Sequence, residues 1–393
     1  MPEAGHSLRG SAVLVVSQHP YPTHRVLRRN VEYIAAQGAS VDVVCLRPET
    51  RGAAISTVGV RLFRVPLAHR RNSALRYPLE YAVFFVAAFV LVTILSLRRR
   101  YRFVEVDTLP DFLVFTALVP RLRGAHVTLF MLELMPEMVA TRLGRAPQGL
   151  LVRVTRWLEA RATGWADRVI TVSETCRRVL ESRGVRPGKL VVVPGSVALS
   201  VTRPLTTVRA ADPYLLTMAT LIKRYGVDVA VRALARLDHD WPQLRLLVLG
   251  EGEQLPELAA LAAALGVGDR VRFLGFQPWE VAMDYARGAS VGLVPVVADG
   301  YGELLLPTKL LEFAALGVPV ACARLPAIAE HFPPEAVAYF EPGDADGLAQ
   351  QVDALLRDPE WSWRQAQAAR EAALDLSWER VGPRYLAALD RAA

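Results

Sequence analysis

Short apolar runs alternate with amphipathic stretches along nearly the whole of this 393-residue chain, and this alternation constrains the fold more than any other feature. The apolar runs of the first half are SAVLVVS, SVDVVCLRP, VRLFRVP, FVEVD, HVTLFML and RVITVS. A helix-like stretch, RVLRRNVEYIAAQG, separates the first two runs and ends at Gly38. Such alternation predicts a parallel sheet covered by helices.

A second alternating series follows residues 196–212, which are rich in Ser, Thr and Pro and are typical of a linker. Its predicted strands are YLLTMATL, LRLLVLG, VRFLGF, SVGLVPV and VPVACA. Its helices are expected near 227–237, 254–265, 279–287, 308–316 and 345–357. The tail SWERVGPRYLAALDRAA predicts one more amphipathic helix.

The chain is too long for a single core, so we expect two domains of α/β class, each a doubly wound, Rossmann-like sheet. The first should comprise residues 1–200 and the second 201–375, with the last helix over 376–393. Ligands of such sheets bind at the carboxyl ends of the strands, and a cleft between the domains would face both sets of ends.

Composition narrows the class of partner. The formal net charge is +7, yet Lys189, Lys223 and Lys309 are the only lysines, so arginine carries nearly all the positive charge. A mildly basic surface explains this charge, and so does an anionic partner such as a nucleotide or an acidic membrane face. No Lys/Arg stripe is interleaved with aromatic residues, which argues against nucleic acid. The three scattered cysteines predict no zinc site and favour a reducing, cytoplasmic compartment, and the N-terminus has no apolar core of signal-peptide length.

One segment does not fit an ordinary soluble surface. Residues 81–97, YAVFFVAAFVLVTILSL, carry no charge; RRRYR follows them, and His69, Arg70, Arg71 and Arg76 precede them. Three interpretations stay open: a transmembrane helix, a fully buried core helix, and a helix lying in a membrane interface with arginines at lipid phosphates.

The stretch GELLLPTKLLEFAALGVPV, residues 302–320, concentrates chemistry after the strand SVGLVPV. Pro307 suits the first turn of a helix, whose N-terminal N–H groups and dipole favour a phosphate. Lys309 opposes that dipole, which an anionic ligand would explain, although a solvated lysine is the alternative. Glu312 lies one turn further along an otherwise apolar helix and needs a partner, for which sugar hydroxyls are suited; a Lys309–Glu312 surface pair is the other interpretation.

The segment LPTKLLEFAALGVPVACARLPAIAEHF resembles the donor-site segment of family 4 glycosyltransferases, which have the GT-B fold. The resemblance runs nearly end to end and in order. It is carried further by VLVVSQHPYPTHRV, TLPDFLVFTALVPRLRGAHVTLFMLELMPE, ADRVITVSE, KLVVVPGSV, LIKRYGVDVAVRAL and LRLLVLGEGEQLPELAALAAALGVGDRVRFLGF. It implies two domains facing a cleft, a last helix that crosses back to the first domain, and transfer of a sugar from a nucleotide-diphosphate donor.

The resemblance also implies roles for residues. Glu312 should hold the ribose hydroxyls, Glu303 should contact the donor sugar, and Lys309 should face the diphosphate. The implied mechanism retains anomeric configuration, needs no metal and no cofactor, and lets a donor phosphate oxygen take the acceptor proton. Further donor-site candidates are Thr308, Lys223, Arg224, Gly250, Gly252, Gly275 and Phe276.

The chain departs from the family pattern at several positions. Eight residues separate Glu303 from Glu312 where seven are usual, so that Leu304 holds the strict position. Leu132 replaces a histidine that normally lies by the donor sugar. Thr220 and Tyr225 stand where an arginine and a lysine often clamp the diphosphate, and the neighbouring Lys223 and Arg224 are candidates to substitute for them.

On the acceptor side, His24 is a candidate contact or a cap at the start of the first helix. Glu133 is a third catalytic candidate, and Glu137 is either an acceptor contact or structural. The predicted function is a glycosyltransferase acting on a lipid-linked or small-molecule acceptor, in the cytoplasm or at the inner face of a membrane. The alternatives are a glycosyltransferase-like protein that binds a nucleotide or partner without transfer, and an enzyme of the same fold that uses a non-oxygen nucleophile.

Overall fold

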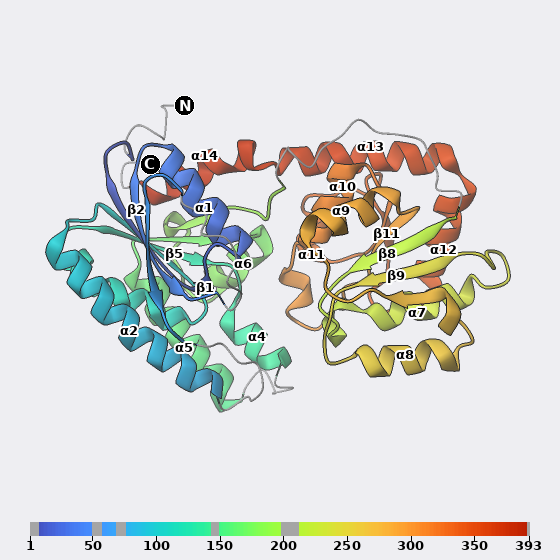
Figure 1. The fold of residues 1–393 in the computed structure, drawn as a ribbon, viewed down its shortest axis with the longest axis horizontal. Coiled ribbons are helices and arrows are strands. Elements are labelled where there is room, and N and C mark those ends of the chain that lie inside the picture. Colours follow the sequence, from blue (N-terminus) through green and yellow to red (C-terminus); the bar gives the residue numbers. More distant parts are fainter. Residues whose placement is uncertain (1–7, 49–56, 68–75, 143–148, 198–211, 391–393) are drawn as a thin grey trace. The chain divides into compact units, whose positions relative to one another are not determined.

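The computed structural model describes residues 8–48, 57–67, 76–142, 149–197 and 212–390. These residues form two compact units. Unit 1 falls within Met1–Val172, Cys176–Val193 and Gly382–Ala393, and unit 2 within Ser173–Thr175 and Pro194–Val381. Each unit is a parallel sheet with helices on both faces (Figure 1), so the prediction of two doubly wound α/β domains is confirmed.

Unit 1 contains a seven-stranded sheet in the order β3-β2-β1-β4-β5-β6-β7, parallel throughout. Its strands are β1 (Ala12–Pro20), β2 (Ser40–Leu46), β3 (Val60–Val65), β4 (Phe103–Asp107), β5 (His126–Met131), β6 (Arg168–Thr171) and β7 (Leu190–Val192). Every residue of β4 and β5 is buried, because helices cover both faces of the sheet. The helices are α1 (Arg25–Ala36), α2 (Arg76–Arg98), α3 (Leu118–Leu122), α4 (Met135–Arg142), α5 (Leu150–Trp165) and α6 (Glu174–Ser182), with 3-10 turns η1 (Asp111–Ala117) and η2 (Pro187–Lys189).

The uncharged segment 81–97 forms most of α2. Phe84, Ala88 and Val92 are fully buried on one side of this helix, whereas Val86 and Val90 on the other side are 61% and 51% exposed. The interpretation as a fully buried core helix is therefore wrong. By length and composition Leu79–Arg98 could cross a membrane, but its buried face packs on η1, α3 and β3 of its own unit. His69, Arg70 and Arg71 lie outside the described residues, as does most of the predicted linker.

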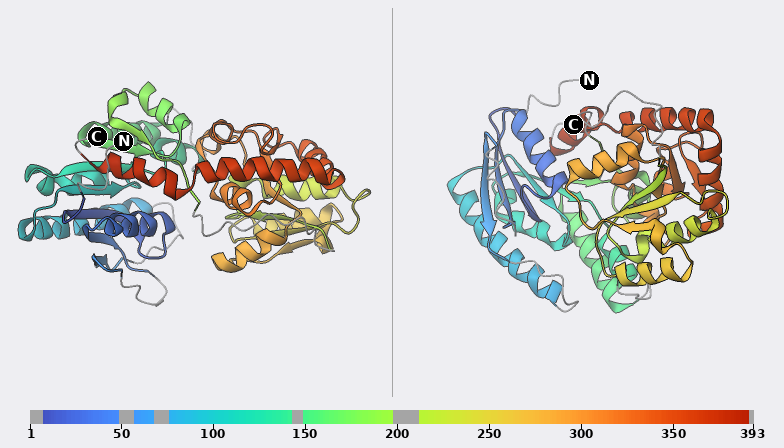
Figure 2. Two further views of the ribbon diagram at one scale, coloured as in Figure 1. Left: turned by 90° about the horizontal axis from the view of Figure 1, so that it is seen from above. Right: turned by 45° about the vertical axis from the view of Figure 1, so that its right-hand side comes forward.

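Unit 2 contains a six-stranded parallel sheet in the order β10-β9-β8-β11-β12-β13. Its strands are β8 (Tyr214–Met218), β9 (Arg245–Leu249), β10 (Val271–Phe273), β11 (Val291–Val294), β12 (Val320–Ala323) and β13 (Ala338–Phe340). Its helices are α7 (Val227–Arg236), α8 (Leu255–Ala264), α9 (Trp279–Gly288), α10 (Thr308–Leu316), α11 (Pro326–Ala329), α12 (Ala345–Arg357) and α13 (Pro359–Asp375), with turns η4 (Lys223–Tyr225), η5 (Gly268–Arg270) and η6 (Gly302–Leu304). Figure 2 shows further views of the same elements.

Close packing fixes α10 on this sheet. Phe313 is fully buried against β11, and a Cβ at Gly292 would come within 2.6 Å of its ring. Gly317 ends α10 with φ of 71°, a left-handed conformation that suits glycine. The first turn of α10 is thereby held after the carboxyl end of β11.

The last helix, α14 (Trp378–Leu389), enters unit 1 at Gly382. Within that unit, the hydroxyl of buried Tyr385 donates a hydrogen bond to Glu105 Oε2 at 2.7 Å, and the Tyr385 ring lies edge-on to Phe130. Burial raises the pKa of the Glu105 carboxyl to about 7. The C-terminal helix is thus part of the core of unit 1.

Candidate active site

The first turn of α10 presents an unusual buried cation. Lys309 is 5% exposed, and its Nζ has no hydrogen-bond partner among the described residues. The ammonium lies 4.9 Å from the centroid of the Tyr225 ring, a cation–π contact that replaces only part of its lost hydration. Burial lowers the pKa of Lys309 to about 8. A solvated surface lysine is thereby excluded, and an anion beside Nζ would relieve the cost of burial.

The N-terminus of α10 adds further donors. Pro307 occupies the N-cap position without a side-chain cap, and exposed Thr308 begins the helix. The first backbone N–H groups of α10 and the helix dipole favour the binding of an anion at this end of the helix. The predicted start of a helix near residue 308 is confirmed, while the donor-site roles of Thr308 and Lys309 stay predictions.

Glu312 lies one turn further along α10 and is half-buried. Its Oε1 accepts a hydrogen bond of 2.9 Å from Nε1 of Trp279, the first residue of α9. This bond fixes the carboxylate on the side of α10 that faces α9. The partner could not be named from the sequence, because the two residues are 33 positions apart.

Glu303 belongs to η6, in the loop between β11 and α10. Its Oε2 accepts from the backbone N–H of Gly300 at 2.8 Å. The neighbouring Asp299 accepts from the N–H groups of Tyr301 and Gly302. Asp299 was missed in the sequence, although an Asp before Gly-Tyr-Gly is a signal for such a turn.

Arg224 belongs to η4, which follows β8, and bonds to this loop. Its Nε donates to Asp299 Oδ2 at 3.0 Å, and its guanidinium lies over the ring of Tyr301. Lys223 is exposed and lines a groove of about 620 Å³ between α7 and α8. Of these two candidates for binding the diphosphate, Arg224 is thus bonded to the loop between β11 and α10, whereas Lys223 projects to the surface.

The glycines of the GEGEQL stretch permit close backbone packing. A Cβ at Gly250 would lie 1.8 Å from the carbonyl oxygen of Ala219, and one at Gly252 would lie 2.4 Å from that of Leu221. Gly275 follows β10 with φ of 67° and accepts a hydrogen bond from Gly250 N at 2.8 Å. Phe276 is 74% exposed, and its N–H donates to Glu251. These residues meet where β8, β9 and β10 end, which is the edge where ligands of parallel sheets bind.

The acceptor-side candidates lie in unit 1. His24 is the N-cap of α1: its Nδ1 accepts from Leu27 N at 3.3 Å, and its ring stacks on His19 at 3.8 Å. Burial and the charge of Arg29 lower the pKa of His24 to about 4, so the imidazole is neutral at pH 7. His24 therefore has a capping role, as one of the two interpretations expected.

The two acidic candidates near α4 have different surroundings. Glu137 forms an ion pair with Arg183, and Arg183 also holds the buried Glu159 at 2.9 Å. Glu133 is half-buried in the short connection between β5 and α4, beside Leu132. Glu137 consequently belongs to an ionic cluster with Arg183 and Glu159. A contact of Glu133 with the acceptor stays a prediction.

Comparisons with known proteins agree with this architecture. The family "Glycosyl transferase 4-like domain" matches residues 23–195, and "Glycosyl transferases group 1" matches residues 212–358. The chain belongs to the family 4 glycosyltransferases and has their GT-B fold, a conclusion that rests on both matches and on the two-sheet architecture.

Three individual proteins that resemble this chain are 20% to 31% identical to it over the aligned residues. A D-inositol 3-phosphate glycosyltransferase of Nocardiopsis dassonvillei is 30% identical over 55% of this chain and 54% of its own length. A GDP-mannose-dependent alpha-(1-6)-phosphatidylinositol monomannoside mannosyltransferase of Mycolicibacterium smegmatis is 31% identical over 44% of this chain and 46% of its own. The chain thus spans about half the length of the curated relatives it matches. The sucrose-phosphate synthase of Thermosynechococcus elongatus superposes with a TM-score of 0.77 at 20% identity, covering 95% of this chain and 97% of that one.

Proposed function

We propose that the protein is a retaining, metal-independent glycosyltransferase that moves a sugar from a nucleotide-diphosphate donor to a lipid-linked or small-molecule acceptor in the cytoplasm. The observation that carries the proposal is the buried Lys309 ammonium at the N-terminus of α10, one turn before Glu312. A buried cation without a hydrogen-bonded partner is costly unless a ligand supplies the counter-charge. A diphosphate supplies it.

Each donor-site residue then has a role that its surroundings permit. Lys309 and the first N–H groups of α10 stabilise the diphosphate, whose negative charge grows as it leaves. Glu312, oriented by Trp279, accepts hydrogen bonds from the ribose hydroxyls. Glu303 contacts the donor sugar from a loop that Asp299 and Arg224 hold in place.

The proposed transfer balances without a metal or a side-chain base. The bond between the anomeric carbon and the phosphate oxygen breaks, and the electron pair leaves with the diphosphate. The acceptor hydroxyl forms its bond to that carbon on the same face, and its proton passes to the leaving phosphate oxygen. The main contribution of the protein is stabilisation of the leaving group and positioning of the two substrates.

The names of the relatives support the substrate classes. One is named for D-inositol 3-phosphate, and the other for GDP-mannose and a phosphatidylinositol monomannoside. A polyol phosphate and a lipid-borne sugar are both hydroxyl acceptors. We propose that unit 1 binds the acceptor, with Glu133 as the candidate carboxylate that contacts it.

One observation favours a second candidate function, nucleotide binding without transfer. The Tyr225 ring occupies one side of the Lys309 ammonium at 4.9 Å, and the family's usual clamp residues are absent at Thr220 and Tyr225. A protein of this kind would bind a nucleoside diphosphate but never consume a donor.

Thermal stability of the purified protein against UDP, GDP, ADP and dTDP tests the donor site, followed by donor hydrolysis with the nucleotide that stabilises. A ligand at 100 times its Kd should add about 2.7 kcal/mol to the free energy of unfolding. Glu312→Ala should reduce this gain to about 1.4 kcal/mol or less, whereas Glu360→Ala, which removes an exposed glutamate on α13, should leave it unchanged. A shift with donor turnover supports transfer, a shift without turnover supports the second candidate, and no shift with any nucleotide contradicts both.

A further inference from the structure

We propose that α2, α3 and α5 of unit 1 form a surface that docks on a lipid bilayer carrying anionic headgroups. We call this surface the basic apolar face. It goes beyond sugar transfer, because it is argued from side chains that have no part in the donor site.

The apolar part begins with α2. Six of its exposed side chains recur every three or four residues and so lie on one side of the helix: Leu79, Val83, Val86, Val90, Ile94 and Leu97. Leu79 and Leu97, at the two ends of this stripe, are 65% and 64% exposed. A soluble surface helix normally carries polar residues there, so a stripe of this length indicates an interaction site.

The stripe is joined to α3 and α5 through η1. Phe112 of η1 packs edge-on against Phe85 of α2, with ring centroids 5.5 Å apart. Phe115 of η1 packs against Trp165 of α5 at the same distance. The helices therefore lie on one face of the sheet, and Figure 1 shows α2 and α5 along the same side of unit 1.

The neighbouring helices expose apolar residues too. Leu122 of α3 is 78% exposed, and on α5 Leu150 and Trp157 are 76% and 56% exposed. Tryptophan is the residue enriched at membrane–water interfaces, where its ring meets the headgroup region.

Charge distribution identifies the partner. Exposed arginines accompany the apolar side chains, among them Arg98 at the end of α2, Arg123 after α3, and Arg153 and Arg156 on α5. Of the described residues of α2, α3 and α5, the acidic ones are Glu80 and Glu159, which are only 4% and 1% exposed. The exposed part of these helices is thus apolar and positively charged, a combination that favours an anionic bilayer.

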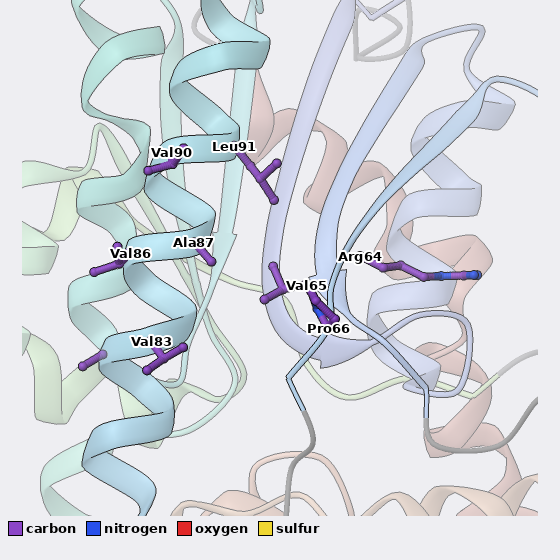
Figure 3. Close-up of a pocket in the computed structure, with 9 residues that line it drawn as sticks. Arg64, Val65, Pro66, Val83, Val86, Ala87, Val90 and Leu91 are labelled. Atoms are coloured by element: carbon purple, nitrogen blue, oxygen red, sulfur yellow. The ribbon is translucent and has the colours of Figure 1, made fainter.

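A groove extends the apolar area beside α2. It has a volume of about 700 Å³ and lies between α2 and the end of β3, the edge strand of the sheet. Val83, Ala87 and Leu91 face Val65 and Pro66 across it, while the charged end of Arg64 points away (Figure 3). Apolar walls of this kind can pack against an acyl chain, whereas they offer a polar ligand few hydrogen-bonding groups.

A second copy of the chain fits this face less well than a bilayer does. Self-association would bring arginines against arginines with no exposed acid on these helices to pair with them, and like charges across an interface are repulsive. Insertion across the bilayer would require α2 to leave η1 and β3, on which its other side is buried.

Flotation of the full-length protein with vesicles tests the proposal. Vesicles of phosphatidylcholine with and without about 30% phosphatidylglycerol would be compared at low and high salt. We expect binding to the anionic vesicles that falls with salt and is reversed by an alkaline wash, as for a surface-bound protein.

The variants V86D/V90D and R153E/R156E should each lower the partition coefficient on anionic vesicles about tenfold or more. V58D and R272E are matched controls, because Val58 is 93% exposed outside these helices and Arg272 is exposed in unit 2; they should bind as the parent does. Unchanged unfolding temperatures would show that the variants are folded.

Three results would overturn the proposal: absence of binding to anionic vesicles, equal loss in the control variants, or binding that resists the alkaline wash. A dimer in solution that V86D/V90D dissociates, together with no vesicle binding, would assign the face to a second copy instead.

Discussion

The Nζ of Lys309 lies 4.9 Å from the centroid of the Tyr225 ring and forms no hydrogen bond with any described residue. The contact joins the first turn of α10 to η4, two segments that follow different strands of unit 2. The ring contact compensates the buried ammonium group only in part.

The pH dependence of nucleotide affinity follows from this contact. Burial lowers the pKa of Lys309 to about 8 without ligand, and a diphosphate bound beside the ammonium group would raise that pKa. Complex formation above pH 8 therefore takes up a proton, so affinity should fall as pH rises, at most about tenfold per pH unit. Calorimetric titration from pH 8 to 10 measures this slope, because the diphosphate itself is fully ionised in that range.

Lys309→Met should bind more weakly at pH 8 and lose the slope, because no proton is taken up. Arg272→Met is the control, since Arg272 is an exposed cation of unit 2 that has no proposed part in the donor site. An unchanged slope in Lys309→Met would show that the proton is taken up elsewhere and that Lys309 does not meet the phosphates.

The hydrogen bond from Trp279 to Glu312 predicts that substitutions at these two residues weaken nucleotide binding to different extents. Glu312→Ala should weaken nucleotide binding about 10- to 100-fold, because hydrogen bonds to a charged acceptor contribute about 1.5–3 kcal/mol. Trp279→Phe keeps the carboxylate and removes the donor that orients it, so its effect should be smaller. Because the proposed ribose contact would be made in ground and transition states alike, KM should change and kcat should not. A kcat effect of Glu312→Ala as large as its KM effect would place Glu312 nearer the reacting carbon.

Much of this arrangement was accessible from the sequence. The expected helices at 308–316 and 345–357 coincide with α10 and α12, because apolar periodicity and the neighbouring Gly and Pro residues mark their ends. In contrast, α13 (Pro359–Asp375) was not predicted. It is rich in alanine, so its buried side is not distinguished by large apolar residues.

The site itself was predicted as a set of residues but not as a set of contacts. The burial of Lys309 and the bond from Trp279 to Glu312 depend on side chains that tertiary packing brings together. A helix that is apolar on all sides gives no periodic signal either, so the sequence could not tell which side of α2 is exposed. Only packing on η1 and β3 determines it.

The backbone contact beneath the GEGEQL loop predicts a steric effect on stability. Gly250→Ala would place a Cβ 1.8 Å from the Ala219 carbonyl oxygen, at a φ of 132°. Gly266→Ala is the control: its φ is also positive, at 74°, but a Cβ there meets nothing within 4 Å. The control should cost about 1–2 kcal/mol of unfolding free energy from backbone strain alone, and Gly250→Ala clearly more. Urea denaturation measures the difference, and equal costs would mean that the loop can move away from β8.

A buried carboxyl in unit 1 predicts how stability changes with pH. Glu105 is fully buried, accepts from Tyr385, and has a pKa of about 7, raised by burial from its ordinary value near 4.5. Between these values the folded state binds more protons than the unfolded state, so stability should fall as pH rises from about 4.5 to 7. Glu105→Gln keeps an acceptor for the Tyr385 hydroxyl and cannot ionise, so it should gain relative stability across this range, by up to about 3 kcal/mol near pH 7. Unfolding temperatures measured from pH 5 to 8 should decline less steeply in Glu105→Gln than in the parent protein. The control Glu360→Gln, which changes an exposed glutamate, should decline as the parent does. If Glu105→Gln also declined as steeply as the parent, Glu105 would be ionised in the folded state throughout this range.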